Sequence, residues 1–203
     1  TSGPTQEPID DVRFISNRSS GKMGAALARA ALLMGAEVVV VSGPVRTPLP
    51  LEAKVVQVRT AEEMLQAALE HGVEANLIIG AAAVADYRPA HRHRGKLRRS
   101  AEATTLELMP NPDVIASLAK AFPDATVIGF AAEPSRSLDV AREKLARKSI
   151  AAIAVNDVSK PGIGFDAEQN NLRLITAEGP VVFESGIMSK LGCALWLLDK
   201  VVT

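Results

Sequence analysis

The chain has 203 residues, of which 47% are hydrophobic, and its 23 basic side chains balance 23 acidic ones to a formal net charge of zero. This length suits one domain with a proper core, and the balanced charge excludes a global field that would recruit nucleic acid or an anionic membrane. A single cysteine excludes an internal disulfide framework and fits the cytoplasm, and no apolar run is long enough to cross a bilayer.

The chain opens on Thr1-Ser2-Gly3, which we interpret as a turn that should follow a strand. No signal peptide is recognisable, so we expect a piece of a longer protein whose first strand is absent or disordered. A polar, glycine-bearing loop then leads into a helix expected at residues 20–34. Unpaired N–H groups and the helix dipole make such an N-terminus an anion site, with Ser20 and Gly21 as candidate phosphate ligands.

A purely structural interpretation of this loop stays open. Ser19 or Ser20 can be the helix cap, Gly24 a close-packing contact and Lys22 a solvated charge. A P-loop is excluded because Met23 stands where that motif needs Ser or Thr, and the compact G-x-G-x-x-G fingerprint is also missing.

Buried strands and helices alternate along the rest of the chain. The alternation predicts a Rossmann-like, doubly wound α/β fold over residues 1–203, with a mostly parallel sheet and helices on both faces. Asn111-Pro112-Asp113 predicts a helix start with Pro112 at the first helical position. Strands are expected at 37–43, 76–82, 126–130 and 150–155, and helices at 60–72, from 111 onward, at 138–148 and at 187–201.

Two segments depart from this alternation. Residues 96–109 have a period-two pattern that predicts a β excursion within a basic strap of about residues 88–109. The second segment, about 170–184, predicts a hairpin turned by Glu178-Gly179-Pro180. Ligands of doubly wound sheets bind beyond the carboxyl ends of the strands. That rule places the rim of the site at Ser42-Gly43, Ala82 to Asp86, Phe130 to Glu133 and Asn156-Asp157.

The basic strap has two interpretations. Its cations suit a nucleic-acid patch, but such patches usually include stacking aromatics and only Tyr87 is near, so a strap over a small polyanion is an equal alternative. The cations are Arg92, Arg94, Lys96, Arg98 and Arg99.

Other reactive side chains give weaker signals. Lys144 and Lys148 share one helix face, which by itself favours a solvated helix end. Cys193 lies in an apolar helix without a nearby base and is expected to be inert, and His91 and His93 lack a third metal ligand.

Several segments match one family together better than they match any motif singly. They are residues 3–10, 12–17, 19–24, Ala82-Ala83-Val84-Ala85-Asp86-Tyr87, Lys96-Leu97-Arg98-Arg99, Asn111-Pro112-Asp113-Val114, Gly129-Phe130-Ala131-Ala132-Glu133 and Val155-Asn156-Asp157-Val158. In this order they resemble bacterial phosphopantothenoylcysteine synthetase over nearly the whole chain. In many bacteria that synthetase is the C-terminal half of a bifunctional protein whose N-terminal half is a flavin-dependent decarboxylase.

The resemblance implies a ligase of coenzyme A biosynthesis. Such an enzyme joins 4′-phosphopantothenate to L-cysteine through an acyl-cytidylate, uses CTP with Mg²⁺ or Mn²⁺, and releases pyrophosphate and CMP. It also implies a homodimer with substrate sites near the subunit interface, and neither a nucleic acid nor a membrane as partner.

The resemblance also implies individual roles. Lys96 would face the α-phosphate in the first step, Asn17 would hold the intermediate in the second, and Arg13 would bind near the substrate phosphate or support that loop. Asp86 would serve the ribose or the metal-bound phosphates. The nucleotide site would be completed by small residues that leave backbone groups free, namely Gly80, Ala81 and Ala82, and by a helix N-terminus at Pro112, Asp113, Val114 and Ile115. Phe130 would lie beside the base, and Lys144 and Lys148 would contact nucleotide groups.

One departure concerns the strap, where Arg98 and Arg99 replace two lysines of the family pattern and the segment before Asn111 is short. Two other classes stay as alternatives, an NAD(P)-dependent Rossmann-type reductase and a non-catalytic nucleotide-binding regulatory domain. The reductase is opposed by Val41-Ser42-Gly43, which lacks an acidic residue for an adenosine ribose.

Overall fold

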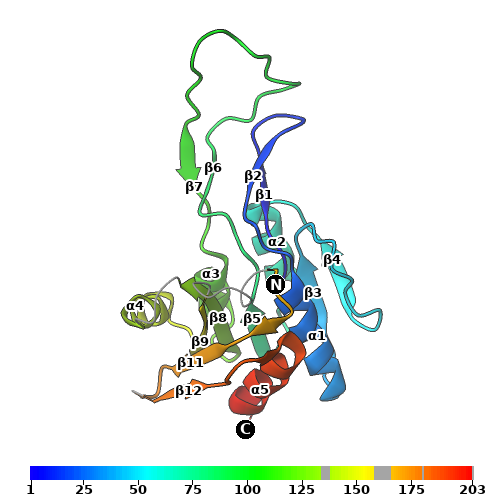
Figure 1. Ribbon diagram of the computed structural model, residues 1–203, viewed down its shortest axis with the longest axis vertical. Coiled ribbons are helices and arrows are strands. Elements are labelled where there is room, and N and C mark those ends of the chain that lie inside the picture. The colour runs from blue at the N-terminus through cyan, green and yellow to red at the C-terminus, as the bar shows by residue number, and fades with distance from the viewer. Residues whose placement is uncertain (134–137, 158–165, 180, 203) are drawn as a thin grey trace.

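The computed structural model describes residues 1–133, 138–157, 166–179 and 181–202 (Figure 1). Its central sheet has the strand order β12-β11-β9-β8-β5. The parallel strands are β5 (Leu77–Gly80), β8 (Thr126–Glu133) and β9 (Ala152–Asp157), while β11 (Leu172–Thr176) and β12 (Val182–Glu184) are antiparallel additions. The hairpin expected near residues 170–184 is therefore confirmed, although Pro180 of its turn lies outside the described residues.

The first residues extend this sheet, and the turn expected at residues 1–3 is wrong. Ser2 forms a parallel bridge with Ser42 at the end of β3 (Val39–Ser42), and Pro4 forms one with Ala83 beyond β5. The Ser2 N–H donates to the Val41 carbonyl at 2.9 Å. Residues 1–4 thus occupy the strand position between β3 and β5, and β4 (Lys54–Gln57) pairs in parallel with β3.

Helices cover both faces of the sheet, as the alternation predicted. On one face α1 (Lys22–Leu33) and α5 (Lys190–Val202) pack on Ala152 and Ala154 of β9. On the other face α2 (Ala61–His71) lies against β3, α3 (Val114–Ala121) against β5 and β8, and α4 (Asp139–Lys148) against β9. Ile153 and Val155 of β9 belong to the core that these helices share. Successive side chains of a strand point to opposite faces, so one strand supplies both halves of the core.

Two predicted helix starts are wrong at the level of single residues. The N-cap of α1 is Gly21 in the left-handed region at φ 78°, without a side-chain cap, rather than Ser19 or Ser20. The N-cap of α3 is Asp113, whose Oδ1 accepts from the Ala116 N–H at 3.1 Å, so Pro112 precedes the cap instead of occupying the first helical position.

Two short antiparallel ladders make an arm that projects from the sheet (Figure 1). One joins β1 (Gln6–Pro8) to β2 (Phe14–Ser16), and the other joins β6 (Tyr87–Pro89) to β7 (Leu108–Pro110). The β excursion expected over residues 96–109 is therefore confirmed only from Leu108 onward, because residues 97–107 form no strand.

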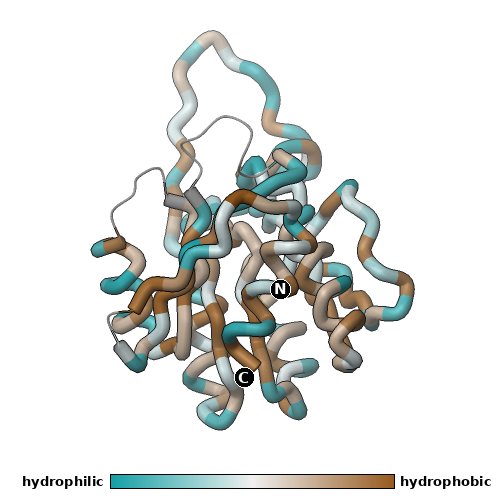
Figure 2. Tube along the Cα trace, turned by 60° about the horizontal axis from the view of Figure 1, so that its bottom comes forward, coloured by the Kyte–Doolittle hydropathy of each residue, from teal (hydrophilic) through white to brown (hydrophobic). Residues whose placement is uncertain are grey.

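The remaining ladder joins β10 (Gln169–Asn170) to β13 (Met188–Ser189), immediately before α5. Hydrophobic segments gather in the strands and helices of the body, whereas hydrophilic stretches are frequent along the loop of the arm (Figure 2). Within the described parts of the chain, none of the helices has the length and hydropathy of a membrane span.

Candidate functional site

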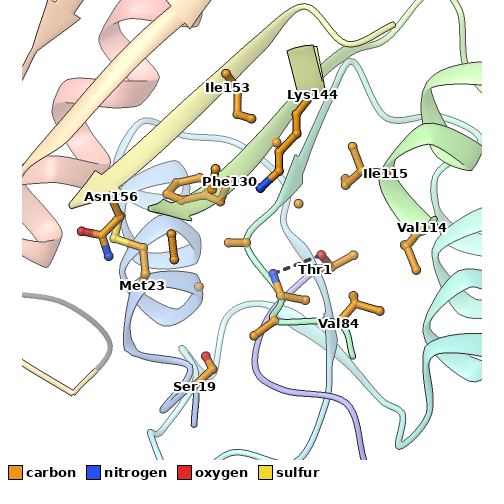
Figure 3. A pocket seen from close by; sticks show the side chains of 18 of the residues that line it. Thr1, Ser19, Met23, Val84, Val114, Ile115, Phe130, Lys144, Ile153 and Asn156 are labelled. Carbon is orange, nitrogen blue, oxygen red and sulfur yellow. Dashed lines mark hydrogen bonds between the residues drawn. The ribbon is translucent and has the colours of Figure 1, made fainter. Parts of the chain in front are cut away.

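A cavity of about 410 Å³ opens beyond the carboxyl ends of β5 and β8, at the edge where such sheets bind ligands (Figure 3). The first turn of α1, the segment after β5, the start of α3 and the lysine-bearing face of α4 all contribute to its lining. Most of the predicted site residues meet there: Ser20, Gly21, Gly80, Ala81, Ala82, Asp86, Pro112, Asp113, Val114, Ile115, Phe130, Lys144 and Lys148.

The floor of the cavity is built from small residues at the end of β5. A Cβ on Gly80 would lie 2.2 Å from Cδ1 of Ile115, so this glycine lets α3 approach the strand closely. The expectation of free backbone groups here is wrong for the N–H groups. The N–H of Ala81 donates to the Thr1 carbonyl at 3.2 Å and that of Ala82 to the Thr1 Oγ1 at 3.4 Å, because the first residues complete the sheet.

The first turn of α1 forms one wall. Lys22, Met23 and Gly24 line the cavity, and the left-handed Gly21 turns the chain into the helix. A Cβ on Gly24 would lie 2.1 Å from the Ser2 Oγ, so the packing interpretation of this glycine is confirmed. The backbone N–H groups of this first turn and the positive end of the helix dipole suit an anion.

Lys22 is not a solvated charge. Its Nζ lies 2.6 Å from Oε1 of Glu168 and 3.6 Å from Oδ1 of Asp166, and the hydrogen bond to Glu168 raises the pKa of the ammonium. The first turn of α1 is thereby tied to residues 166–168.

The opposite wall joins α3 to α4. Lys148 Nζ lies 2.8 Å from Oδ1 of Asp113, the oxygen that also caps α3. Burial raises the pKa of Asp113, but the hydrogen bonds from Lys148 and the Ala116 N–H outweigh it and hold that pKa below its ordinary value. Lys144, one turn earlier, reaches into the cavity beside Phe130 (Figure 3).

The cavity also includes residues that the sequence did not single out as ligands. Lys190, the first residue of α5, is only 7% exposed, and burial lowers the pKa of its ammonium. Asn170 is 1% exposed and lines the same end. The sequence signal for Lys190 is a charged residue just before the mainly apolar run of residues 191–198.

Asn156, in the predicted rim, lies beside Phe130 and Met23 (Figure 3). Its Oδ1 is shielded from solvent and has no hydrogen-bond partner among the described residues. A shielded, unpaired amide oxygen is costly in free energy, so a ligand that donates a hydrogen bond there would remove that cost.

Three predicted catalytic residues lie outside the cavity, on or below the arm. Asn17 is nearest, since its Nδ2 donates to the carbonyl of the cavity residue Ala83 at 2.9 Å. The Arg13 guanidinium bonds the Asp10 carboxylate and donates to the Leu97 carbonyl at 2.7 Å, so Arg13 supports the strap. Lys96 is exposed on the strap, and its side chain is not part of the cavity wall.

The carboxylates at the cavity suit a metal ion that is also bound by phosphate oxygens of a nucleotide. The described residues hold no group of three His, Cys, Asp or Glu side chains that could bind a metal. Asp86 stands at the cavity, and Asp113 is engaged by Lys148. Mg²⁺ in nucleotide sites takes one or two carboxylates plus phosphate oxygens and water, and this donor set fits that pattern.

Comparisons with known proteins show which family the chain belongs to. Residues 1–203 match the family model described as "DNA/pantothenate metabolism flavoprotein C-terminal domain". The chain is 44% identical over 208 residues to the "Coenzyme A biosynthesis bifunctional protein CoaBC" of Escherichia coli K12, covering 100% of this chain and 50% of that protein. It is 43% identical over 182 residues to the protein of that name from Vibrio cholerae, covering 88% and 46%.

A solved structure extends the comparison to the fold. The crystal structure of the C-terminal domain of "Coenzyme A biosynthesis bifunctional protein CoaBC" matches with a TM-score of 0.84 at 36% identity, covering 99% of this chain and 92% of that one. The chain spans about half the length of the curated relatives it matches.

Proposed function

The chain belongs to the family of DNA/pantothenate metabolism flavoprotein C-terminal domains, and on that premise we propose that it joins 4′-phosphopantothenate to L-cysteine at the expense of CTP. This reaction belongs to coenzyme A biosynthesis, the process for which its relatives are named. The proposal includes a flavin-dependent decarboxylase domain, either fused to this chain as the N-terminal half of a bifunctional protein or associated with it, and a location in the cytoplasm.

One observation carries the proposal: the N-termini of α1 and α3 open on the same cavity as Lys144 and Lys148. The reaction brings a carboxylate against a triphosphate, and these anions repel each other. Helix N-termini and ammonium groups offset that repulsion without any covalent nucleophile. In this arrangement the triphosphate lies at Ser20 and Gly21, and the base lies beside Phe130.

The chemistry has two steps. First, the substrate carboxylate oxygen attacks the α-phosphorus of CTP, the bond to the bridging oxygen breaks, and pyrophosphate leaves. Second, the cysteine amine attacks the acyl carbon, loses a proton, and displaces CMP. Lys96 offsets the charge that develops on the α-phosphate in the first step, and Asn17 holds the acyl-cytidylate in the second.

Mg²⁺, or Mn²⁺, would be held by Asp86 together with phosphate oxygens of the nucleotide. When bound, the ion offsets phosphate charge and thereby makes pyrophosphate a better leaving group. The protein contributes the cavity shape and the fixed cations around it.

A homodimer is also part of the proposal, because the two ladders of the arm expose apolar side chains. Phe14 is 42% exposed on β2, and Tyr87 and Leu108 on the second ladder are 53% and 45% exposed. A second copy that covers this surface would remove it from water and bring the strap close to a cavity.

The experiment mixes the purified protein with Mg²⁺, CTP, 4′-phosphopantothenate and cysteine and measures pyrophosphate. Release that depends on both phosphopantothenate and nucleotide supports the ligase. Nucleotide binding without turnover supports the regulatory alternative, and NADPH oxidation with a carbonyl substrate supports the reductase. Competition among the four nucleoside triphosphates in the same assay measures the preference for CTP.

A further inference from the structure

Two adjacent aspartates in the turn between β1 and β2 hold the backbone on both sides of Lys96. Asp10 Oδ2 accepts from the Leu97 N–H at 3.0 Å, and Asp11 Oδ2 accepts from the Gly95 N–H at 2.8 Å. These bonds join positions more than 80 residues apart in sequence. The Cα of Lys96 therefore lies between two anchored peptide groups.

Asp10 is the better organised of the two anchors. It is only 3% exposed, and its Oδ1 accepts from the N–H groups of Val12 and Arg13 at 2.8 and 2.7 Å. The Arg13 guanidinium bonds the same carboxylate through Nε at 3.0 Å and donates to the Leu97 carbonyl, so it closes the unit from the other side. Hydrogen bonds of a carboxylate with N–H and guanidinium groups are among the stronger ones in proteins.

Asp11 adds a weaker anchor. Its carboxylate pairs with Arg92 at 2.8 Å, but the two side chains are 51% and 60% exposed, and exposed pairs of this kind contribute little. The Ile9 carbonyl accepts from the His93 N–H at 2.9 Å and extends the contact by one more bond. Residues 92–97 are therefore docked on the turn of the first ladder.

We propose that Asp10 is a positioning residue that presents Lys96 to the reacting phosphate, with Arg13 as part of the same unit. This inference rests on the proposed function, because the role of Lys96 belongs to that proposal. Lysine has a long flexible stem, and fixing its Cα limits the volume that the ammonium can search. Small misplacements of a charged group can cost about 100-fold in rate.

The first test is amide hydrogen exchange of the full chain carrying Asp10→Asn. The substitution removes the charge and one carboxylate acceptor, so the Leu97 amide should exchange roughly 10-fold to 100-fold faster than in the wild type. The matched control is Glu107→Gln, which removes an exposed charge further along the strap and should leave the Leu97 amide unchanged. Unchanged exchange at Leu97 in the Asp10→Asn variant contradicts the inference.

The second test separates positioning from general destabilisation. Asp10→Asn should slow pyrophosphate release about tenfold or more, mainly through kcat, while conversion of supplied acyl-cytidylate to amide keeps its rate. In a Lys96→Gln background the same substitution should cost nothing further, because it acts through Lys96. An equal loss in both backgrounds contradicts the inference.

A further variant guards against misfolding of Asp10→Asn. Leu97→Pro removes the N–H that donates to the Asp10 carboxylate and leaves the turn of the first ladder intact. It should therefore slow pyrophosphate release as much as Asp10→Asn does. Full activity of a folded Leu97→Pro variant would contradict the inference.

A wild-type protein that releases no pyrophosphate overturns the proposed function, whereas an active wild type with unaffected variants overturns only the role of Asp10.

Discussion

Lys148 and Asp113 join the end of α4 to the start of α3 through an ion pair of 2.8 Å at the cavity. The same Asp113 oxygen caps α3, so one carboxylate fixes both a helix N-terminus and a lysine. The arrangement keeps Lys148 at the cavity, beside the N-terminus of α3 and the positive end of its dipole.

Replacing Asp113 by Ala should lower the free energy of unfolding by about 1 kcal/mol, because α3 loses its N-cap. Asp124→Ala is the matched control, since Asp124 is an exposed aspartate in the loop after α3. Urea unfolding of both variants measures the difference. Equal midpoints for the two would show that the cap contributes nothing measurable.

The contribution of Asp113 to the stability of the protein should be lost in acid. Its folded pKa lies below the ordinary value near 3.8, so the carboxylate stabilises the fold above that pH and loses this contribution as the pH falls through the folded pKa. Urea unfolding at a series of pH values measures the difference in free energy of unfolding between wild type and Asp113→Asn. This difference should shrink as the pH falls below about 5. A difference that is independent of pH contradicts this expectation.

Lys96→Gln and Asn17→Asp should stop the reaction at different stages. Without the ammonium the acyl-cytidylate should not form, and the expected loss is about 100-fold or more. Asn17→Asp removes the side-chain N–H that donates to the Ala83 carbonyl, so the intermediate should accumulate without conversion to amide. Quenched-flow mass spectrometry detects the intermediate, with Lys120→Gln on the exposed end of α3 as control. Arrest of both variants at one stage refutes this division of roles.

Gly24→Ala should destabilise the protein by about 1–3 kcal/mol in the absence of any nucleotide, because its Cβ would overlap Ser2. Gly179→Ala serves as control, since a Cβ there meets nothing within 4 Å, and its effect should stay within about 0.5 kcal/mol. Thermal unfolding without ligand measures both. A neutral Gly24→Ala would favour a ligand-binding reason for this glycine.

Cys193 should resist thiol reagents in the folded protein. The side chain is 0% exposed, burial raises the pKa of the thiol, and Sγ donates to the Asn170 carbonyl at 3.4 Å. Labelling with a disulfide reagent at pH 8 should be negligible over minutes and complete in denaturant. Rapid labelling of the native protein contradicts the buried position.

Much of the fold could be predicted because the signals are local. The run Val38 to Val41 predicts a strand, which is confirmed as β3, although Val39 is 43% exposed rather than buried. The capping box of Thr60 and Glu63 marks the start of α2, where both hydrogen bonds form. The errors at Ser19, Ser20 and Pro112 arose where several residues could all cap, and the backbone conformation decided among them. Gly21 starts α1 because it adopts a left-handed conformation.

Two signals in the sequence predicted part of the site, namely the rule that ligands bind at the carboxyl edge of the sheet and the resemblance to a known family. Those two signals brought together Phe130, Lys144 and the starts of α1 and α3. Lys190 and the docking of Leu97 on Asp10 depend on contacts between distant parts of the chain, which no local pattern encodes. The position of Thr1 to Pro4 inside the sheet was missed for the same reason.

The most direct measurement of the central claim is a single turnover without cysteine. Protein, Mg²⁺, CTP and 4′-phosphopantothenate are mixed, quenched and analysed for pyrophosphate and for the mass of the acyl-cytidylate. We predict about one equivalent of each per site, because pyrophosphate release is tied to formation of the bound intermediate. Pyrophosphate without the acyl-cytidylate, or neither product where a known synthetase forms both, contradicts the account.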